Sequence, residues 1–449
     1  MKTNTVNVRN VLESRCRTDA SFHLSEGISV RRKILLSPYG SILINDSAAD
    51  IYYGNRAHRV YVADKEHGIP FLSSSDILLS DFSNVKFASK KYTPHIEQLK
   101  LEKDWILISR SGTIGNCAYT NEDFSSCLSS EHVIRLIPNG RIKPGMLYAY
   151  LSSSYGYLLL TQGTFGAVIQ HIEPDYVASI PIPCFPEDFQ SRIDTLIKSS
   201  ALLREEATKY KRQAISIIER YLNSSNTPSI NIITNHQICS NYRRMDSQYQ
   251  SEVLLRKDDN PGLLSLTIGQ IAKNIYVGNR GKRYYVNGGI PFLSSSEMML
   301  FNPKRWCKQI SVRTPSLKSL RVQEKDILIS RSGTIGNCLF VSNGLKDVTI
   351  SEHALRLRID EDKVAPEYIY AYLCSWQGQR KLKNAAYGSV IITLGEDFVR
   401  EISLPKASEN DYNEIVELIK SFTKKNDEAA ELESKAILIV EKEIESWSK

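Results

Sequence analysis

The sequence predicts a mixed α/β (α+β) protein built from two related domains, each followed by a long helix. Three observations support this prediction. Blocks of sequence in the first half of the chain recur in the second half, short apolar runs bounded by turn residues fill most of each copy, and a segment with helical periodicity ends each copy. The length of 449 residues is also typical of two or three domains rather than one.

The repeated blocks establish the duplication. Ile106–Cys117 recurs letter for letter at Ile327–Cys338, 221 residues later, and Gly68–Ser75 recurs at Gly289–Ser296 at the same offset. The shorter matches are Ile51–Arg56 with Ile275–Arg280, Ser130–His132 with Ser351–His353, Tyr148–Leu151 with Tyr370–Leu373, and Phe165–Ile169 with Tyr387–Ile391. So long a period indicates two whole domains, because the repeats of solenoid proteins run to about 20–50 residues.

Each copy is expected to contain short strands and at least one helix. Trp105–Ser109 and His132–Ile137 are apolar runs between turn clusters, which is typical of strands. Pro144–Leu160 begins with Pro-Gly and continues as a predicted helix. A proline-bounded segment closes each copy, at Ile180–Pro183 and at Ile402–Pro405.

The segments that follow, residues 187–224 and 407–449, have the spacing of long paired helices. Apolar or small residues recur at alternating steps of three and four, the pattern of a coiled-coil seam, and both segments keep the same register. Only Lys425 and Glu443 interrupt the pattern. Two unrelated surface helices are the alternative, but the matching register favours a pair. A helix of ~35 residues is about 50 Å long. This division leaves the domains at residues 1–186 and 225–406.

The composition indicates a folded protein in a reducing compartment. Hydrophobic residues make up 42% and charged residues 24% of the chain, and the net charge of +7 leans only mildly toward polyanionic ligands. The eight cysteines are scattered without a C-x-x-C pair, so neither a structural zinc site nor a secreted disulfide framework is expected. Since no signal-like segment or long apolar run occurs, we expect a cytoplasmic chain without a membrane span.

The candidate binding groups are basic and hydroxyl side chains beside glycines. Arg110 and Arg331 hold the same place in the repeated S-R-S-G-T-I-G-N block, where hydroxyl and backbone N–H groups suit phosphate oxygens and a guanidinium can bond phosphate or guanine. A structural turn with the arginine in an ion pair explains the block equally well. A Gly-Asn-Arg turn interleaved with tyrosines and a Ser-Ser-Ser run accompany the block in each copy, although a solvated hairpin tip and a polar loop remain alternatives.

The candidate nucleic-acid contacts fall in both copies. In the first they are Asn55, Arg56, Arg59, Ser73, Ser74, Ser75, Lys90, Lys91, Arg110, Ser111 and Thr113. In the second they are Asn279, Arg280, Lys282, Arg283, Ser294, Ser295, Ser296, Arg313, Arg331, Ser332 and Thr334. Lys90, Lys91 and Arg313 lie in segments that differ between the copies, where discrimination between ligands is expected.

Catalytic motifs are missing from the sequence. It contains no phosphate-binding G-x-x-x-x-G-K-[ST] loop and no H-E-x-x-H zinc motif, and the adjacent Glu131-His132 and Glu352-His353 pairs are more often structural. Neither Asn-Pro-Pro-Tyr nor Asp-Pro-Pro-Tyr, the tetrapeptides of amino-methyltransferases, occurs. We expect neither a catalytic site nor a metal site in this chain.

The organisation resembles the specificity (S) subunit of type I restriction–modification systems. The resemblance covers nearly the whole chain and rests on the order domain, helix, domain, helix, and on the block at Ile106–Asn116 and Ile327–Asn337. The Arg-x-Asp openings at Arg17 and Arg244 and the Phe165–Ile169 and Tyr387–Ile391 segments also look like that family.

This resemblance implies a non-catalytic subunit of a phage-defence system. Its two target-recognition domains, related by a pseudo-twofold axis, would read the two halves of a bipartite double-stranded DNA site. The two helices would pair as an antiparallel coiled coil, measure the spacer and dock two methyltransferase (M) subunits, and motor–nuclease (R) subunits would join for restriction. S-adenosylmethionine, ATP and Mg would be bound by the partners and no cofactor by this chain. Because the copies share so much scaffold, related but non-identical half-sites in inverted orientation are expected.

Three alternatives remain open at the level of sequence. The chain could be a recognition subunit of another phage-defence or type II-like assembly, a stand-alone nuclease or methyltransferase, or a protein-binding adaptor without a DNA role.

Overall fold

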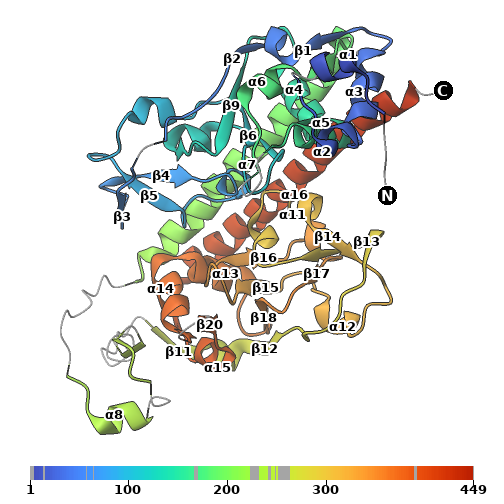
Figure 1. Cartoon of the computed structure of the whole chain (residues 1–449). Coiled ribbons are helices and arrows are strands. Elements are labelled where there is room, and N and C mark those ends of the chain that lie inside the picture. The colour runs from blue at the N-terminus through green and yellow to red at the C-terminus, as the bar shows by residue number, and fades with distance from the viewer. Residues whose placement is uncertain are drawn as a thin grey trace. The chain divides into compact units, whose positions relative to one another are not determined.

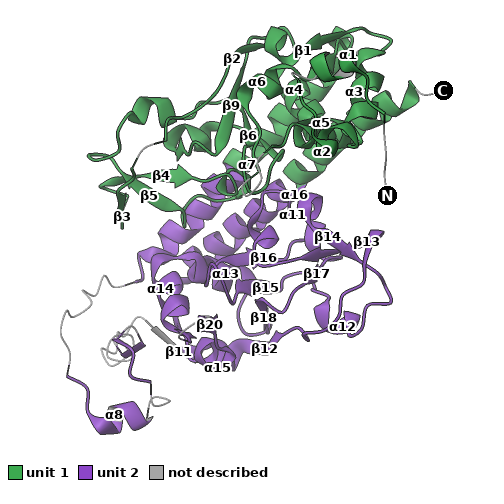
Figure 2. Ribbon diagram, viewed as in Figure 1, with its two compact units in different colours: residues 1–205, 428–449 green, residues 206–427 purple. Residues whose placement is uncertain are grey.

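The computed structural model describes residues 5–13, 16–56, 58–63, 65–165, 170–222, 232–240, 244–247, 249–250, 263–388 and 392–447. The chain forms two compact units (Figure 2): unit 1 comprises residues 1–205 and 428–449, and unit 2 comprises residues 206–427. Each long helix, α7 (Glu187–Glu219) and α16 (Glu409–Ser446), contributes one part to each unit. Among the described residues no helix is long and apolar enough to cross a membrane.

The described part of unit 1 is organised around an antiparallel sheet in the order β2 (Ala48–Tyr53), β9 (Val133–Pro138), β6 (Ile106–Ser109) and β7 (Cys117–Tyr119) (Figure 1). The predicted strands at Trp105–Ser109 and His132–Ile137 are confirmed to within one residue. All four residues of β6 are buried, as expected for the central strand of a covered sheet.

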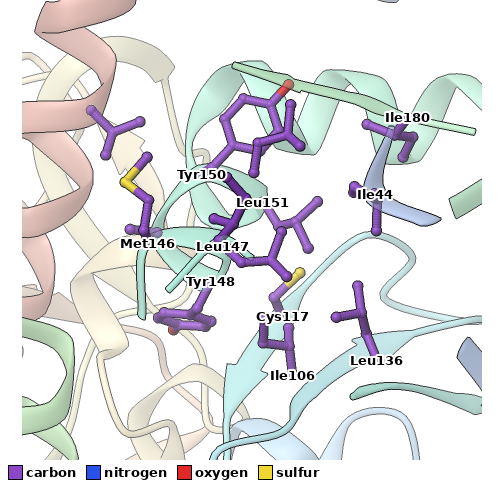
Figure 3. Packing of buried hydrophobic residues seen from close by; sticks show 14 of the residues in the cluster. Ile44, Ile106, Cys117, Leu136, Met146, Leu147, Tyr148, Tyr150, Leu151 and Ile180 are labelled. Carbon is purple, nitrogen blue, oxygen red and sulfur yellow. The ribbon is translucent and has the colours of Figure 1, made fainter. Parts of the chain in front are cut away.

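Helices α4 (Pro144–Ser152) and α5 (Ser154–Gln162) complete the core of unit 1. Figure 3 shows Leu147 and Leu151 of α4 close to Cys117 and Ile106 of the sheet. The single helix predicted at Pro144–Leu160 is wrong, because the chain turns at Ser153, which is extended (φ −68°, ψ 163°) and accepts a hydrogen bond from the Gly156 N–H as an N-cap. A Cβ atom at Gly156 would collide with the Tyr150 carbonyl oxygen.

Unit 2 repeats this arrangement. Its main described sheet runs β12 (Ala272–Val277), β18 (Ala354–Ile359), β15 (Ile327–Ser330) and β16 (Cys338–Phe340), again antiparallel, and packs with α13 (Pro366–Cys374) and α14 (Trp376–Asn384). Ser375 caps α14 as Ser153 caps α5. The duplicated sequence therefore encodes a duplicated mixed α/β fold, as predicted.

A smaller sheet lies beside each main sheet. In the described part of unit 1 it consists of β3 (Tyr61–Val62), β5 (Lys86–Ser89), β4 (Gly68–Leu72) and β8 (Leu128–Ser129); in unit 2 it consists of β14 (Lys308–Ile310), β13 (Tyr285–Leu293) and β17 (Thr349–Ile350). The proline-bounded closing segments pair as short strands, β10 (Pro181–Pro183) with β1 (Ser41–Leu43) and β21 (Ser403–Pro405) with β11 (Leu263–Thr267).

Short elements complete the described chain. In unit 1 they are α1 (Val8–Glu13), α2 (Ala20–His23), α3 (Gly27–Leu35), α6 (Pro174–Ala178) and the 3-10 helices η1 (Ile44–Ser47), η2 (Asp76–Leu78), η3 (Ile96–Leu99) and η4 (Glu122–Ser126). In unit 2 they are α8 (Asn235–Ser240), α10 (Ile268–Ile271), α11 (Pro303–Trp306), α12 (Leu317–Leu320), α15 (Glu396–Arg400), β19 (Ala386–Tyr387), β20 (Thr393–Leu394), η5 (Glu297–Met299) and η6 (Asn343–Leu345).

The two long helices pack against each other within each unit, and in antiparallel directions. In unit 1, the Ser200 hydroxyl donates to the Ala429 carbonyl oxygen (2.7 Å), and the Phe185 ring just before α7 lies 5.8 Å from that of Trp447 just after α16. In unit 2, Arg220 pairs with Asp411 (3.1 Å). The pairing predicted from the heptad spacing is confirmed, although α7 ends at Glu219, short of residue 224.

The polar residues in the predicted seam have partners. Lys425 pairs with Glu206, and the Glu443 carboxylate accepts hydrogen bonds from the Tyr39 hydroxyl (2.7 Å) and the Trp447 indole (3.2 Å). These two positions therefore do not interrupt the packing.

A buried arginine stands at the centre of each main sheet. In unit 1, Arg135 is fully buried and donates to the carbonyl oxygens of Val133 (3.3 Å), Leu99 (3.2 Å) and Ser129 (2.9 Å). Burial lowers the pKa of Arg135 to about 10, and the ring of Tyr52 lies 5.6 Å away. The guanidinium thus joins the main sheet to the 3-10 helix at residues 96–99 and to strand β8 of the smaller sheet.

Arg356 has the same role in unit 2. It donates to the carbonyl oxygens of Arg321 (2.9 Å) and Ser319, and it lies 4.6 Å from the Tyr276 ring. Burial lowers its pKa as well. A Cβ atom at Gly278 would lie 2.5 Å from an Nη atom of Arg356, so the glycine of the Gly-Asn-Arg turn provides room for the buried guanidinium.

We predict that Glu433→Ala destabilises unit 1 by about 3 kcal/mol, measured by denaturant unfolding. Glu433 is fully buried and accepts hydrogen bonds from the Tyr148 hydroxyl and from Arg204 (3.0 Å), so the truncation leaves a partly buried cation and a buried hydroxyl without this acceptor. The exposed Glu417→Ala serves as the control and is expected to change stability by less than about 0.5 kcal/mol. Equal effects of the two variants would contradict the prediction.

We also predict that Gly278→Ala lowers the stability of unit 2 by about 1–3 kcal/mol, because the added methyl group displaces the Arg356 guanidinium from its carbonyl partners. Gly281→Ala, in the same turn, is the matched control, since its Cβ atom would meet no atom closer than 3.5 Å. Thermal unfolding followed by circular dichroism measures both variants. A Gly278→Ala protein that melts with the control would show that the guanidinium accommodates a methyl group.

Candidate nucleic-acid interface

The repeated S-R-S-G-T-I-G-N block forms the same turn in both units. In unit 1, Gly112 and Gly115 have φ values of +77° and +84°, and in unit 2 Gly333 and Gly336 have +78° and +89°. These left-handed conformations favour glycine, so the turn geometry itself requires these glycines. Part of the identity between the copies therefore has a structural cause.

The turn is fixed to the Ser-Glu-His segment. In unit 1, the backbone N–H of Arg110 donates to the His132 carbonyl oxygen (2.8 Å), and the Ser111 Oγ lies 2.8 Å from the His132 Nδ1. Unit 2 repeats both contacts at 2.8 Å, between Arg331, Ser332 and His353. Each predicted serine thus holds a histidine, which the sequence analysis had treated only as a structural residue.

The Ser-Ser-Ser runs reach the same place. The Ser130 N–H donates to the Leu72 carbonyl oxygen (3.0 Å), which places the first run directly beside the Ser-Glu-His segment, and Ser351 makes the same contact with Leu293 (2.9 Å). Within the first run, the Ser73 hydroxyl is engaged by Asp76 (2.6 Å) and Ser75 is exposed. In the second, Ser294 and Ser296 bond each other (2.9 Å), Ser295 is partly exposed, and Ser296 is exposed.

Two of the predicted basic contacts are engaged inside the units. Arg59 pairs with the buried Glu131 and lies 4.7 Å from the Phe71 ring. Arg283, with 7% of its side chain exposed, approaches Glu352 (3.4 Å) and donates to the Asn279 carbonyl oxygen (2.7 Å). These arginines hold the Gly-Asn-Arg turn to the Ser-Glu-His segment, and Glu131 and Glu352 are the partners that sequence reasoning missed.

The tips of the Gly-Asn-Arg turns carry the exposed basic groups. Arg56 and Lys282 are exposed, and the Arg280 side chain is 92% exposed with only a distant approach to Glu352 (3.9 Å). Asn55 is exposed and donates to Gln98 (2.7 Å), and Asn279 is exposed beside Ser319. These side chains are available to a ligand in solution.

Arg110 and Arg331 differ in their surroundings although their blocks are identical. Arg110 forms an ion pair with Glu173 and lies 4.2 Å from the Tyr53 ring, while Arg331 donates through Nε to the Leu394 carbonyl oxygen (3.1 Å). Glu173 lies 63 residues after Arg110 in the sequence, and no local pattern predicted it as a partner. The segments 166–169 and 389–391, which contain most of the FGAVI and YGSVI matches, lie outside the described residues.

The remaining candidates are not joined to the turn by any hydrogen bond or ion pair in the described chain. Lys90 donates to the Glu66 carbonyl oxygen (2.8 Å), Lys91 lies 5.2 Å from the Tyr92 ring, and Arg313 is exposed just after β14. The Thr113 and Thr334 side chains belong to the exposed part of the turn, with Thr113 bonded to Ser109 (3.0 Å).

The electrostatics of the unit 1 turn are positive. Burial lowers the pKa of His132, and the nearby charges of Arg110, Arg59 and Arg56 lower it further. His132 is therefore neutral at pH 7, and the arginines supply the charge. Within the described residues no group of three or more His, Cys, Asp or Glu side chains could hold a metal ion. The arrangement suits an anionic ligand, and the His132 Nε2 lies 3.6 Å from the Glu131 carboxylate, which is also paired with Arg59.

Comparison with known proteins identifies the family. The family model of the type I restriction modification DNA specificity domain matches residues 62–198 and 268–436, about two thirds of the chain and one segment in each copy. No curated protein matches the chain.

Several solved structures are similar at low identity. The S subunit of a type I restriction–modification system from M. genitalium is 14% identical, with 92% of this chain and 97% of that chain covered and a TM-score of 0.35. The HsdS subunit from Thermoanaerobacter tengcongensis is 13% identical, with 91% and 99% covered and a TM-score of 0.30. The type IIG restriction endonuclease BpuSI is 13% identical over 42% of this chain and 29% of that chain, with a TM-score of 0.29.

The family model spans the repeated turn and the Ser-Glu-His segment in both units, together with residues 187–198 of α7 and residues 409–436 of α16. The chain belongs to the type I restriction–modification DNA specificity family, whose members are non-catalytic subunits that recognise DNA sequence.

Proposed function

We propose that this chain is the S subunit of a type I restriction–modification complex and that each unit reads one half of a bipartite double-stranded DNA site. The observation that carries the proposal is the recurrence, in both units, of one exposed basic turn attached to one rigid hydroxyl-bearing turn. Two similar binding surfaces, one in each unit, suit a DNA site that has two parts. In this assignment residues 1–186 and 225–406 are the target-recognition domains.

The described side chains divide into contacts and supports. Arg56, Arg280 and Lys282 are exposed at the turn tips and are the proposed phosphate contacts. The serine runs and the Thr113 and Thr334 side chains supply further exposed hydroxyls. Lys90, Lys91 and Arg313 lie in segments that differ between the two copies, where half-site discrimination is proposed. Arg59 and Arg283 act as supports, because each is already engaged by a glutamate.

The long helices are proposed to set the distance between the two half-sites and to dock the partners. Residues 187–224 and 407–449 would form this spacer, held by the antiparallel contacts within each unit. A rod of about 50 Å limits the separation of half-site centres to about 15 bp. Two methyltransferase (M) subunits and the motor–nuclease (R) subunits would supply the chemistry in the cytoplasm, using S-adenosylmethionine, ATP and Mg, while this chain positions them.

We predict that mapping N6-methyladenine across the source genome reveals a two-part methylated motif that disappears when this gene is deleted. The two halves should be related but not identical, in inverted orientation, because the copies share a scaffold and differ in their variable segments. A contiguous motif, or a methylation pattern unaffected by the deletion, would contradict the proposed role and favour a recognition subunit of another assembly.

We predict that Arg280→Ala/Lys282→Ala weakens binding to a 40-bp mixed-sequence duplex and reduces the slope of log K against log salt concentration by about 1–2, since each lost phosphate contact accounts for ~0.9. Lys273→Ala/Lys363→Ala is the control with the same change of charge. Those lysines lie beside Asp360, just past the opposite end of β18 from His353. An equal loss in the control would mean that net charge, and not the turn, drives binding.

A further inference from the structure

The two copies of the repeated block present their arginines differently. In unit 1 the Arg110 guanidinium is paired with the Glu173 carboxylate, lies 4.2 Å from the Tyr53 ring and has 13% of its side chain exposed. A carboxylate on one side and an aromatic face on another satisfy a guanidinium well and partly cancel its charge. Arg110 is thus engaged within its own unit.

Arg331 lacks both of these partners. Val277 follows Ile275-Tyr276 where Tyr53 follows Ile51-Tyr52. Gly395 is the N-cap residue of α15, as Glu173 is of α6. Among the described residues, no carboxylate lies within ion-pair distance of Arg331 and no aromatic ring lies beneath it; its guanidinium makes one hydrogen bond, from Nε to the Leu394 carbonyl oxygen (3.1 Å). The side chain is partly exposed, so both Nη groups remain available to a ligand.

Neighbouring packing explains why unit 2 has no acid at this position. In unit 1 the Tyr176 ring of α6 lies directly against Gly163, where a Cβ atom would collide with it. Unit 2 has Ala385 in place of Gly163. There the corresponding ring, Phe398, packs instead against Gly395, whose Cβ atom would lie 2.8 Å from it.

The same position is crowded from a second direction. A Cβ atom on Gly395 would also lie 2.9 Å from the Tyr387 ring. A glutamate at residue 395 would therefore displace two aromatic rings. The unpaired state of Arg331 is thus built into the packing of α15, and it is not a matter of one side-chain rotamer.

We infer that Arg331 is a DNA contact of unit 2, whereas Arg110 is a positioning residue held inside unit 1. The inference rests on the proposed function, and it assigns different uses to two identical sequence blocks. The available Nη donors suit a phosphate oxygen or the O6/N7 edge of guanine, which share the same acceptor chemistry. Only the guanine contact would carry sequence information.

The test compares matched variants of the full chain, bound to a mixed-sequence 40-bp duplex and to a duplex carrying the mapped two-part motif. Arg331→Ala should weaken binding to the motif duplex about tenfold, and Arg110→Ala by less than about twofold. A loss confined to the motif duplex indicates the guanine contact, and an equal loss on both duplexes indicates phosphate. Arg331→Lys should restore phosphate binding but not guanine binding, because an ammonium cannot reproduce the bidentate geometry.

A third variant tests the ion pair between Arg110 and Glu173. Glu173→Gln should release Arg110 and steepen the slope of log K against log salt concentration by about 1, because unit 1 gains a phosphate contact. Arg110→Ala should lower the melting temperature without changing that slope. Equal losses from Arg110→Ala and Arg331→Ala, or no loss from Arg331→Ala in a chain with a normal melting curve, would overturn the inference and leave the proposed function standing. A wild-type chain that binds neither duplex at low salt would overturn both.

Discussion

The candidate nucleic-acid interface of each unit depends on the hydrogen bonds that a buried arginine of the main sheet donates to carbonyl oxygens. Arg135 and Arg356 carry their charges into the protein interior without a carboxylate partner of their own among the described contacts, and carbonyl oxygens and a tyrosine ring offset the cost of desolvation. The oxygens belong to η3 and β8 in unit 1 and to α12 and its C-cap in unit 2, so the guanidinium fixes these elements to the main sheet. In unit 2 the Gly-Asn-Arg turn closes over this group and requires Gly278 for that reason, whereas in unit 1 a Cβ atom at Gly54 would collide with the Leu99 side chain.

The repeated turn is held by contacts inside its own unit, so its conformation does not depend on the side chains that vary around it. The repeated turn is held by positive-φ glycines and by a serine–histidine contact, and both features are satisfied inside the unit. Changes around the turn can therefore accumulate without loss of the scaffold. The pairs Tyr53 and Val277, and Glu173 and Gly395, are such changes, and they alter what an identical arginine can do.

Much of the architecture follows from the sequence, because duplication and periodicity are properties of the sequence itself. The strand limits and the helix pairing were predicted from them. The break at Ser153 was not, since it arises from a close approach of Gly156 to the preceding turn of chain, which no local pattern encodes. The partners of Arg59, Arg110 and Arg283 were also missed, because they come from segments 63 to 72 residues away in the sequence.

Three arginines near the repeated turns are paired with glutamates of the same unit, and this pairing affects how selectively the chain can bind one DNA sequence. Any cation on a DNA-facing surface adds to sequence-independent affinity, which competes with the specific site across the whole genome. In this chain Arg59, Arg110 and Arg283 are each matched by a glutamate, whereas the basic side chains at the tips of the Gly-Asn-Arg turns are exposed. Under the proposed function, this pairing would weaken the sequence-independent attraction of each unit for DNA. Under the proposed function, two weakly binding units joined by the long helices would bind the correct pair of half-sites together, since the second contact would form at a high effective concentration.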